Sequence, residues 1–132
     1  MVLVDTSIWI DHFRQTSVTL SSFLEAEAVA VHPFILGELA CGNLNNRKEI
    51  IACLHAMPSA AKVEDDEILL FIERHHLMGR GIGLMDAHIL ASCCLDACLL
   101  WTRDKRLQVV ASEMCIAFSQ HQLERQNPVH GL

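Results

Sequence analysis

The chain begins with MVLVDTSIWID at residues 1–11, and this stretch determines the predicted fold. Val2–Val4 form a short apolar run, typical of a strand that is buried on both faces of a parallel sheet. Thr6 and Ser7 then offer a helix N-cap ahead of a second apolar run. Asp5 therefore stands at the carboxyl end of the strand, where open α/β sheets bind their ligands. The alternative is that Asp5 only forms a turn or caps the helix.

The rest of the chain alternates short apolar runs with segments of helical spacing. Strands are expected at residues 2–4, 28–31, 98–101 and 114–118, with 61–63 either a minor strand or a linker. Helices are expected at residues 7–13, 18–26, 33–41, 47–56, 64–77, 86–95 and 105–112. This alternation predicts one α/β domain over residues 1–132, with a mainly parallel sheet covered on both faces. The polar tail from about residue 120 is expected to fray.

The composition argues against several classes of protein. A chain of 132 residues with 52% hydrophobic residues can form a folded core. It has no apolar run long enough to span a membrane and no signal peptide, so we expect a cytoplasmic protein. The formal net charge of −6 argues against a nucleic-acid binder that relies on a basic patch. Metal ions bound to acidic residues would offset part of that charge.

The six cysteines do not form a pattern typical of a disulfide framework or a zinc site. Cys94 and Cys98 are not matched by a second pair of ligands, and free thiols are expected in a reducing compartment. Gly79, Gly81 and Gly83 do not follow a predicted strand, so they do not indicate a dinucleotide site.

Three further acidic residues draw attention. Glu38 lies on an apolar stripe of the helix expected at 33–41, where a lone buried carboxylate is costly unless it is paired or bound to metal. The alternative is a helix rotated so that Glu38 reaches solvent. Asp86 opens an apolar helix and Asp104 follows a buried strand; for both, the alternative is a role in helix capping.

Taken together, the four acids predict a metal site. If the strands before Asp5 and Asp104 are neighbours, these two residues and Asp86 meet at one edge of the sheet, with Glu38 above them. Two bare carboxylates ~4 Å apart repel by about 4 kcal/mol at an effective dielectric constant near 20, so such a cluster needs cations. Oxygen ligands favour Mg²⁺ or Mn²⁺ over zinc. A site of this kind can hold two ions that clamp the attacking and leaving oxygens of a phosphodiester.

Four segments of the chain resemble the motifs of PIN-domain nucleases, and most closely those of the VapC-type ribonuclease toxins of prokaryotic toxin–antitoxin operons. The segments are VDTSIWI at 4–10, GELA at 37–40, LMDAHILA at 84–91 and LLWTRDKRL at 99–107. They occur in the expected order and span almost the whole chain. The resemblance implies a PIN-like α/β/α sandwich and a divalent-metal-dependent endoribonuclease, the toxin of a type II toxin–antitoxin pair.

The same resemblance assigns roles to the matched acids. Asp5, Glu38, Asp86 and Asp104 would form the catalytic, metal-binding cluster, with Asp5 and Asp86 as the firmest ligands of Mg²⁺ or Mn²⁺. A water molecule activated by the metal would attack the scissile phosphorus in line. The products would carry a 5′-phosphate and a 3′-hydroxyl if the mechanism follows other two-metal nucleases.

The resemblance also implies supporting residues and partners. Thr6 and Thr102 would orient the acidic cluster by hydrogen bonds. Besides the RNA substrate, the expected partners are a small VapB-type antitoxin, with a segment lying across the active groove, and a second copy of the chain in a homodimer. The basic residues that are candidates for contacts with the RNA backbone, or alternatively are only solvated, are Arg14, Arg47, Lys48, Arg103, Lys105 and Arg106.

Two other functions stay open at this point. A phosphatase could use Asp5 as its nucleophile, but such an enzyme would want an acid two residues later, where this chain has Ser7. A catalytically silent PIN-fold domain could keep the fold for partner contacts, although the presence of all four acids argues against loss of activity.

Overall fold

The computed structural model describes residues 1–119, which fold around a three-stranded parallel sheet. The strands are β1 (Val2–Val4), β2 (Val29–Ala30) and β3 (Leu99–Trp101). Their order is β2-β1-β3, so the first strand of the chain occupies the centre of the sheet. The predicted α/β class with a parallel central sheet is confirmed.

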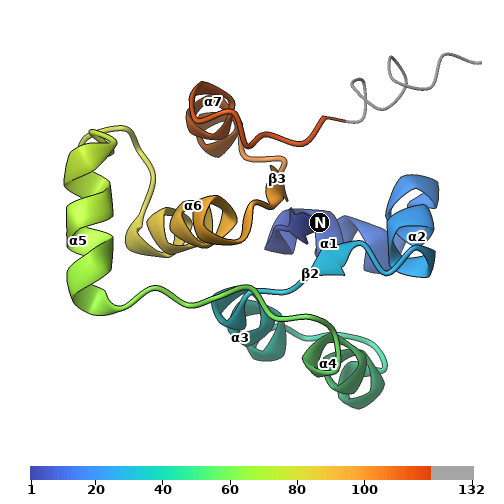
Figure 1. Ribbon diagram of the computed structural model, residues 1–132. Helices are drawn as coiled ribbons and strands as arrows, with labels where there is room; N and C mark the ends of the chain where they lie inside the picture. Colours follow the sequence, from blue (N-terminus) through green and yellow to red (C-terminus); the bar gives the residue numbers. More distant parts are fainter. Residues whose placement is uncertain (120–132) are drawn as a thin grey trace, which may run out of the picture.

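Seven helices surround this sheet within the described residues. They are α1 (Thr6–Arg14), α2 (Val18–Glu25), α3 (Pro33–Cys41), α4 (Arg47–His55), α5 (Asp65–Arg74), α6 (Leu84–Asp96) and α7 (Lys105–Glu113). Figure 1 shows α6 on one side of the sheet and α1 and α2 on the other, with α3 and α4 beyond the β2 edge and α7 beyond the β3 edge. Helix α5 packs on the outer side of α6.

The burial of the central strand follows from this layering. All three residues of β1 are buried, because helices cover both faces of the sheet and strands flank both edges. Helix α6 is buried continuously from Ala87 to Cys93, as expected for a helix between the sheet and α5. No helix within residues 1–119 has the length and apolar character needed to cross a lipid bilayer.

The C-terminal part of the sheet differs from the prediction. Instead of a strand at 114–118, a single parallel bridge joins Ala117 to Leu100. The physical reason lies at Cys115, whose φ of 62° turns the backbone out of the extended conformation. Residues 61–63, expected to be either a minor strand or a linker, form no strand and act as a linker. The predicted fraying from about residue 120 lies outside the described residues.

Helix α6 ends in an unusual residue before the chain enters β3. Ala97 adopts the left-handed conformation, with φ 53° and ψ 42°. Its N–H and that of Cys98 both donate to the carbonyl oxygen of Cys93, which closes the helix. Glycine is the usual residue at such a position, because a β-carbon makes the left-handed conformation costly.

Replacing Ala97 by glycine should therefore stabilise the protein. We expect Ala97→Gly to raise the free energy of unfolding by roughly 0.5–1 kcal/mol, since the relief of backbone strain exceeds the added entropy of the unfolded chain. Urea denaturation measures this difference. The matched control is Ala56→Gly at the end of α4, where φ is −82° and no strain exists to be relieved. Equal effects of the two substitutions would contradict the expectation.

Candidate active site

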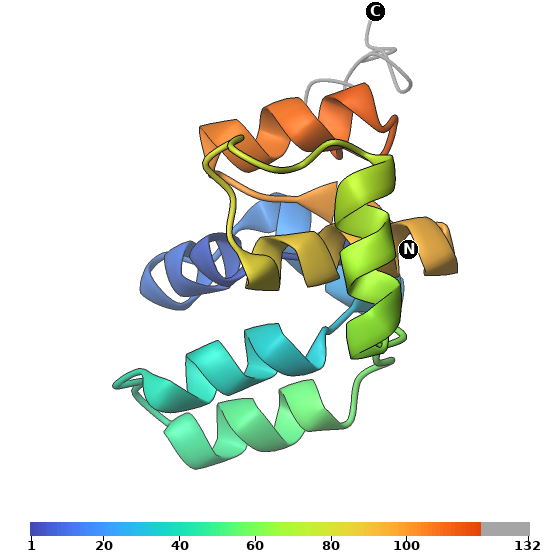
Figure 2. The same ribbon diagram turned by 90° about the vertical axis from the view of Figure 1, so that its left-hand side faces the viewer.

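A pocket of about 560 Å³ lies where β1 and β3 end, and all four predicted acids line it: Asp5, Glu38, Asp86 and Asp104. Asp5 directly follows β1, and Asp104 follows β3 after two intervening residues. Asp86 lies in the first turn of α6 and Glu38 lies on α3. Figure 2 shows α6 and α7 beginning on the same side of the sheet. The parallel pairing of β1 with β3 thus delivers acids that are far apart in sequence to one edge.

Asp5 is held by hydrogen bonds to both of its carboxylate oxygens. The backbone N–H of Thr6 donates to Oδ1 at 2.8 Å, and the hydroxyl of Thr102 donates to Oδ2 at 2.6 Å. The backbone N–H of Asp5 donates to the carbonyl of Trp101 at 2.9 Å. Asp5 is thus the N-cap of α1, and the expectation that Thr6 or Ser7 would cap this helix is wrong. Asp5 rather than Thr6 or Ser7 is the cap because its carboxylate accepts the backbone N–H of Thr6 at the start of the helix.

Thr102 lies between two of the acids. Its side chain is buried, donates to Asp5 and accepts a hydrogen bond from the backbone N–H of Asp104 at 3.1 Å. Asp104 in turn caps α7, because its Oδ1 accepts from the N–H groups of Arg106 and Leu107 at 2.9 and 3.2 Å. The capping alternative for Asp104 is therefore correct, and yet the same side chain lines the pocket.

Glu38 is joined to the first helix. The hydroxyl of Thr6 donates to Oε2 of Glu38 at 2.7 Å. Glu38 is exposed, so the alternative in which α3 turns it toward solvent is the one observed. It nevertheless lines the pocket, because the solvent it faces is the space between α1 and α3. The two threonines thus each bridge one acid to another element of the site.

Asp86 is affected by the charges of the other three acids. Its partial burial raises its pKa above the ordinary value for aspartate. The N–H of Gly83 donates to its Oδ2 at 3.3 Å and acts in the opposite direction, whereas the negative charges of Asp5, Asp104 and Glu38 raise the pKa further. Asp86 is therefore close enough to the other three acids for their negative charges to act on it.

The donor set of the pocket fits an oxygen-binding cation. Carboxylates and hydroxyls are the ligands that Mg²⁺ and Mn²⁺ prefer. The pocket is also lined by Ser7, whose hydroxyl is buried and has no hydrogen-bond partner among the described residues. However, within residues 1–119 no three acidic, histidine or cysteine side chains are already arranged to hold an ion. The chemistry fits a metal, while the side chains do not form a ready-made ligand set.

Of the predicted RNA-binding cations, Arg47 and Lys48 lie at the start of α4 and are not among the described residues that line the pocket, and the other four divide into two pairs. Arg14 and Arg103 line the pocket, and Arg103 also forms an ion pair with Asp11 at 3.2 Å. Lys105 and Arg106 are exposed on the first turn of α7 and are not among the described residues that line the pocket. Only the first pair is thus placed beside the acids.

The sequence analysis missed a buried polar connection between α3 and α6, the helices that carry two of the four acids. His32 is 0% exposed and accepts the backbone N–H of Phe34 at Nδ1, 3.0 Å away, which caps α3. The neutral ring must then carry its proton on Nε2, which lies 3.1 Å from the Ser92 hydroxyl on α6. Ser92 donates onward to the carbonyl of Ala61 at 2.5 Å. The only sequence signal was a histidine directly before the proline that opens a helix.

Comparisons with known proteins identify the family and the fold. A family model described as PIN domain matches residues 2–113. Ribonuclease VapC32 of Mycobacterium tuberculosis, from strains CDC 1551 / Oshkosh and H37Rv, is 37% identical over 121 residues, covering 91% of this chain and 98% of the relative. The crystal structure of PAE2754 from Pyrobaculum aerophilum has a similar fold, with a TM-score of 0.62 at 14% identity over 95% of this chain and 93% of that one.

The buried His32 should make stability depend on pH. Its burial, with smaller effects of the charges of His88 and Lys62, lowers its pKa from 6.5 to about 4. Below pH 6.5 the unfolded chain takes up a proton that folded His32 does not, so stability falls as the pH drops from 6.5 toward 4. We expect this residue to account for about 2 kcal/mol of lost unfolding free energy between pH 7 and pH 5.

His32→Asn should remove that part of the pH dependence, because asparagine can still accept the N–H of Phe34 but does not titrate. Urea denaturation at the two pH values measures it. The companion variant Ser92→Ala should lose about 1–3 kcal/mol of unfolding free energy at both pH values, because it removes only a hydrogen-bond partner. The dependence of its unfolding free energy on pH should stay the same as in the wild type. If the unfolding free energy of His32→Asn depended on pH as strongly as that of the wild type, His32 would not be the source of this dependence.

Proposed function

The chain belongs to the PIN-domain family and is a VapC-type nuclease, and on that premise we propose that it is a divalent-metal-dependent endoribonuclease, the toxin of a type II toxin–antitoxin pair. The observation that carries the proposal is the single pocket lined by four carboxylates from four different segments. The name of the relative, Ribonuclease VapC32, supports RNA as the substrate. A cytoplasmic location goes with this function.

The acids would act by holding Mg²⁺ or Mn²⁺. Asp5 and Asp86 would be the firmest ligands, with Glu38 and Asp104 acting directly or through water. A bound divalent cation would lower the pKa of a water molecule and offset charge on the scissile phosphate. The carboxylates themselves need not form a covalent bond to the substrate. Burial raises the pKa of Asp86, and the charges of Asp5, Asp104 and Glu38 raise it further; a cation beside these acids would offset both effects.

Two threonines would hold the acidic side chains in place, and two arginines would bind the RNA phosphates. Thr102 fixes the carboxylate of Asp5, and Thr6 fixes that of Glu38, so neither acid rotates freely. Arg14 and Arg103 flank the acids and would contact the phosphates on either side of the scissile bond. Without such cations, the acidic pocket would repel the RNA backbone.

We propose two protein partners in addition to RNA. The first is a small VapB-type antitoxin that would cover the pocket, as the VapC name of the relative suggests. The second is another copy of this chain, in a homodimer. An Asp5-dependent phosphatase is the competing activity, and a silent PIN-fold domain is the competing binding role.

Removing one acid should abolish RNA cleavage. We expect Asp5→Asn to reduce cleavage of a mixed RNA substrate by at least roughly 100-fold, because the cation would lose one of its two firmest ligands. EDTA should abolish cleavage, because it removes the cation itself. Gel analysis of 5′-labelled RNA with mapping of the product ends measures this. The matched control is Asp66→Asn on the exposed side of α5, outside the pocket. Turnover of p-nitrophenyl phosphate through an aspartyl-phosphate, without RNA cleavage, would instead indicate the phosphatase. The absence of both activities would indicate the silent domain.

Metal binding should also reverse the effect of one substitution on stability. The pKa of Asp86 is higher in the folded protein than in the unfolded chain, so the protein loses stability as the pH rises through the unfolded value and Asp86 ionises. In EDTA at pH 7, Asp86→Asn should therefore melt at a higher temperature than the wild type. Saturating Mg²⁺ should stabilise the wild type, by about 2.7 kcal/mol at 100 times its Kd, and Asp86→Asn much less. Thermal melts in EDTA and in Mg²⁺ would show the reversal; parallel shifts of the two proteins would count against the site.

A further inference from the structure

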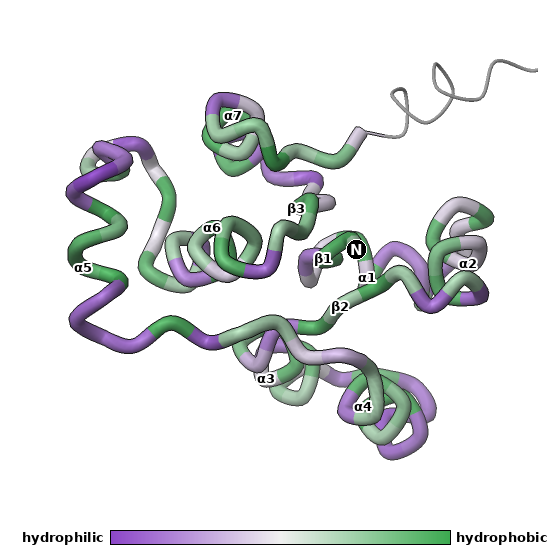
Figure 3. The backbone as a smooth tube through the Cα atoms, viewed as in Figure 1, coloured by the Kyte–Doolittle hydropathy of each residue, from purple (hydrophilic) through white to green (hydrophobic). Residues whose placement is uncertain are grey.

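Arg103 lies beside the acidic pocket and carries a positive charge that the four acids attract. It directly precedes Asp104 in the sequence and lines the pocket together with the acids. Figure 3 shows the stretch that leads from β3 into α7 as hydrophilic. A guanidinium forms its strongest hydrogen bonds with carboxylates, often through two of its N–H groups at once. We would therefore expect Arg103 to turn into the pocket and pair with the acids there.

The structure shows a different partner for this arginine. Nη1 of Arg103 lies 3.2 Å from Oδ2 of Asp11 on α1, and Arg103 forms no other ion pair within residues 1–119. Asp11 follows Ser7 by four positions and precedes Arg14 by three, so it lies on the face of α1 that carries these two pocket residues. Asp11 itself is not among the described residues that line the pocket. The ion pair thus holds the guanidinium at the rim of the pocket, on the side of α1.

Stability does not account for this ion pair. The side chains of Arg103 and Asp11 are 65% and 39% exposed, and ion pairs between exposed side chains contribute little to the free energy of unfolding. What the pair does determine is the position of a permanent positive charge, because a guanidinium keeps its proton in proteins. A guanidinium inside the pocket would occupy carboxylate oxygens that a divalent cation needs.

We propose that Asp11 is a positioning residue that holds Arg103 outside the acidic cluster, so that the four carboxylates stay available to a divalent cation. The inference rests on the proposed function and deepens it, by adding a residue that controls access to the metal site. Asp11 acts through Arg103 and needs to touch neither the cation nor the RNA. From the same position, Arg103 can meet a phosphate at the rim of the pocket.

Removing the charge of Asp11 should release the arginine. In a crystal structure of Asp11→Asn grown in EDTA, we expect the guanidinium of Arg103 within hydrogen-bond distance of Asp104 or Asp5, because the pocket acids are the charged partners that remain beside it. The conservative variant Asp11→Glu should keep the arginine at the rim, because its carboxylate still reaches the guanidinium. A guanidinium that pairs with none of the pocket acids in Asp11→Asn would overturn the proposal.

Binding of Mn²⁺ provides a second measurement that does not depend on RNA cleavage. Isothermal titration calorimetry of the full chain should give Asp11→Asn a Kd for Mn²⁺ at least about fivefold higher than that of the wild type, because the arginine competes for the carboxylates. Arg103→Gln should bind Mn²⁺ at least as tightly as the wild type. The double variant Asp11→Asn/Arg103→Gln should regain the affinity of Arg103→Gln, because no arginine is left to compete.

The double variant separates this role from a direct effect of Asp11. If the carboxylate of Asp11 attracted the cation by itself, or only supported α1, its loss would weaken Mn²⁺ binding equally with and without Arg103. A role that works through the arginine instead disappears when the arginine is absent. Circular dichroism verifies that each variant is folded.

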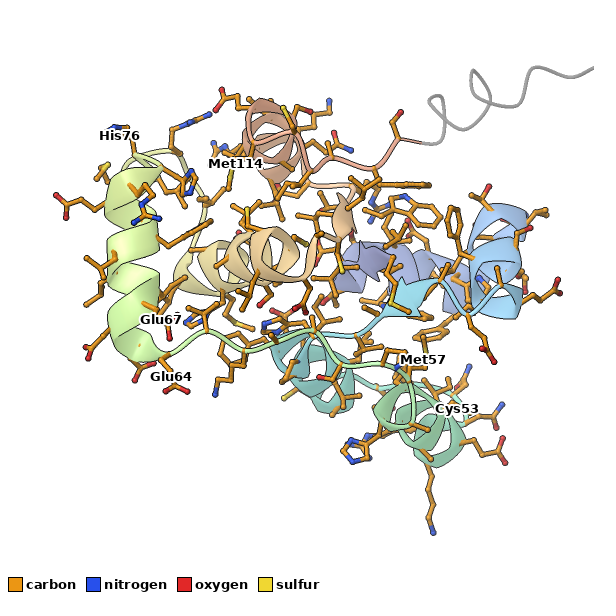
Figure 4. The ribbon with its side chains drawn as sticks, viewed as in Figure 1. Cys53, Met57, Glu64, Glu67, His76 and Met114 are labelled. Carbon is orange, nitrogen blue, oxygen red and sulfur yellow. The ribbon has the colours of Figure 1, made fainter. Side chains whose placement is uncertain are left out.

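A second ion pair within residues 1–119 offers a matched control. Arg80 and Glu113 lie 2.9 Å apart, and neither is among the described residues that line the pocket. The pair lies at the end of α7 that Met114 marks in Figure 4, whereas Asp104 precedes the start of this helix. Glu113→Gln should therefore leave the Kd for Mn²⁺ unchanged.

The outcomes distinguish this inference from the function on which it rests. Equal weakening of Mn²⁺ binding by Asp11→Asn with and without Arg103 would overturn the inference and leave the metal site in place. A wild type that binds no Mn²⁺ would refute the proposed metal dependence. The position of Arg103 in the crystal of Asp11→Asn would then decide alone whether Asp11 holds it outside the acidic cluster.

Discussion

The hydrogen bond from the Thr102 hydroxyl to Asp5 connects the ends of two neighbouring parallel strands, and the candidate site depends on it. The strands are only three residues long, so few backbone hydrogen bonds hold them together. Asp5 strengthens this junction through its own backbone N–H, which donates to Trp101. Thr102 then extends the connection to the backbone of Asp104. The same contacts that close the sheet therefore align two acids from opposite ends of the chain.

Helix capping and site formation use the same carboxylates. Asp5 caps α1, Asp104 caps α7 and Asp86 accepts an N–H at the start of α6, so three of the four acids stand at helix N-termini. The partial positive charge at a helix N-terminus stabilises a nearby carboxylate. This interaction offsets part of the cost of placing several acids around one pocket. It also means that the choice between a capping role and a role in the pocket, posed from the sequence for Asp5, Asp86 and Asp104, was not a true alternative.

The sequence predicted those features that local patterns determine. The run Val2–Val4 and the Pro33–Cys41 helix follow from apolar spacing and from a proline start, and both have the predicted bounds. The strand expected at 114–118 is wrong because the backbone turns at Cys115, which apolarity does not reveal. The role of His32 was missed because its partner Ser92 is 60 residues away, so no local pattern connects them. The convergence of the acids on one pocket was inferred from the alternation of strands and helices, whereas their detailed spacing was not.

The sequence distance across the central strand pair has a consequence for biosynthesis. Asp5 and Thr102 are separated by 97 positions, and β1 lies between β2 and β3. A ribosome makes the first strand early and the third late, so the nascent polypeptide can pair β1 with β2 long before β3 exists. The acidic pocket is therefore completed only after most of the chain has been translated. A growing chain would therefore lack the assembled acidic pocket until β3 has left the ribosome.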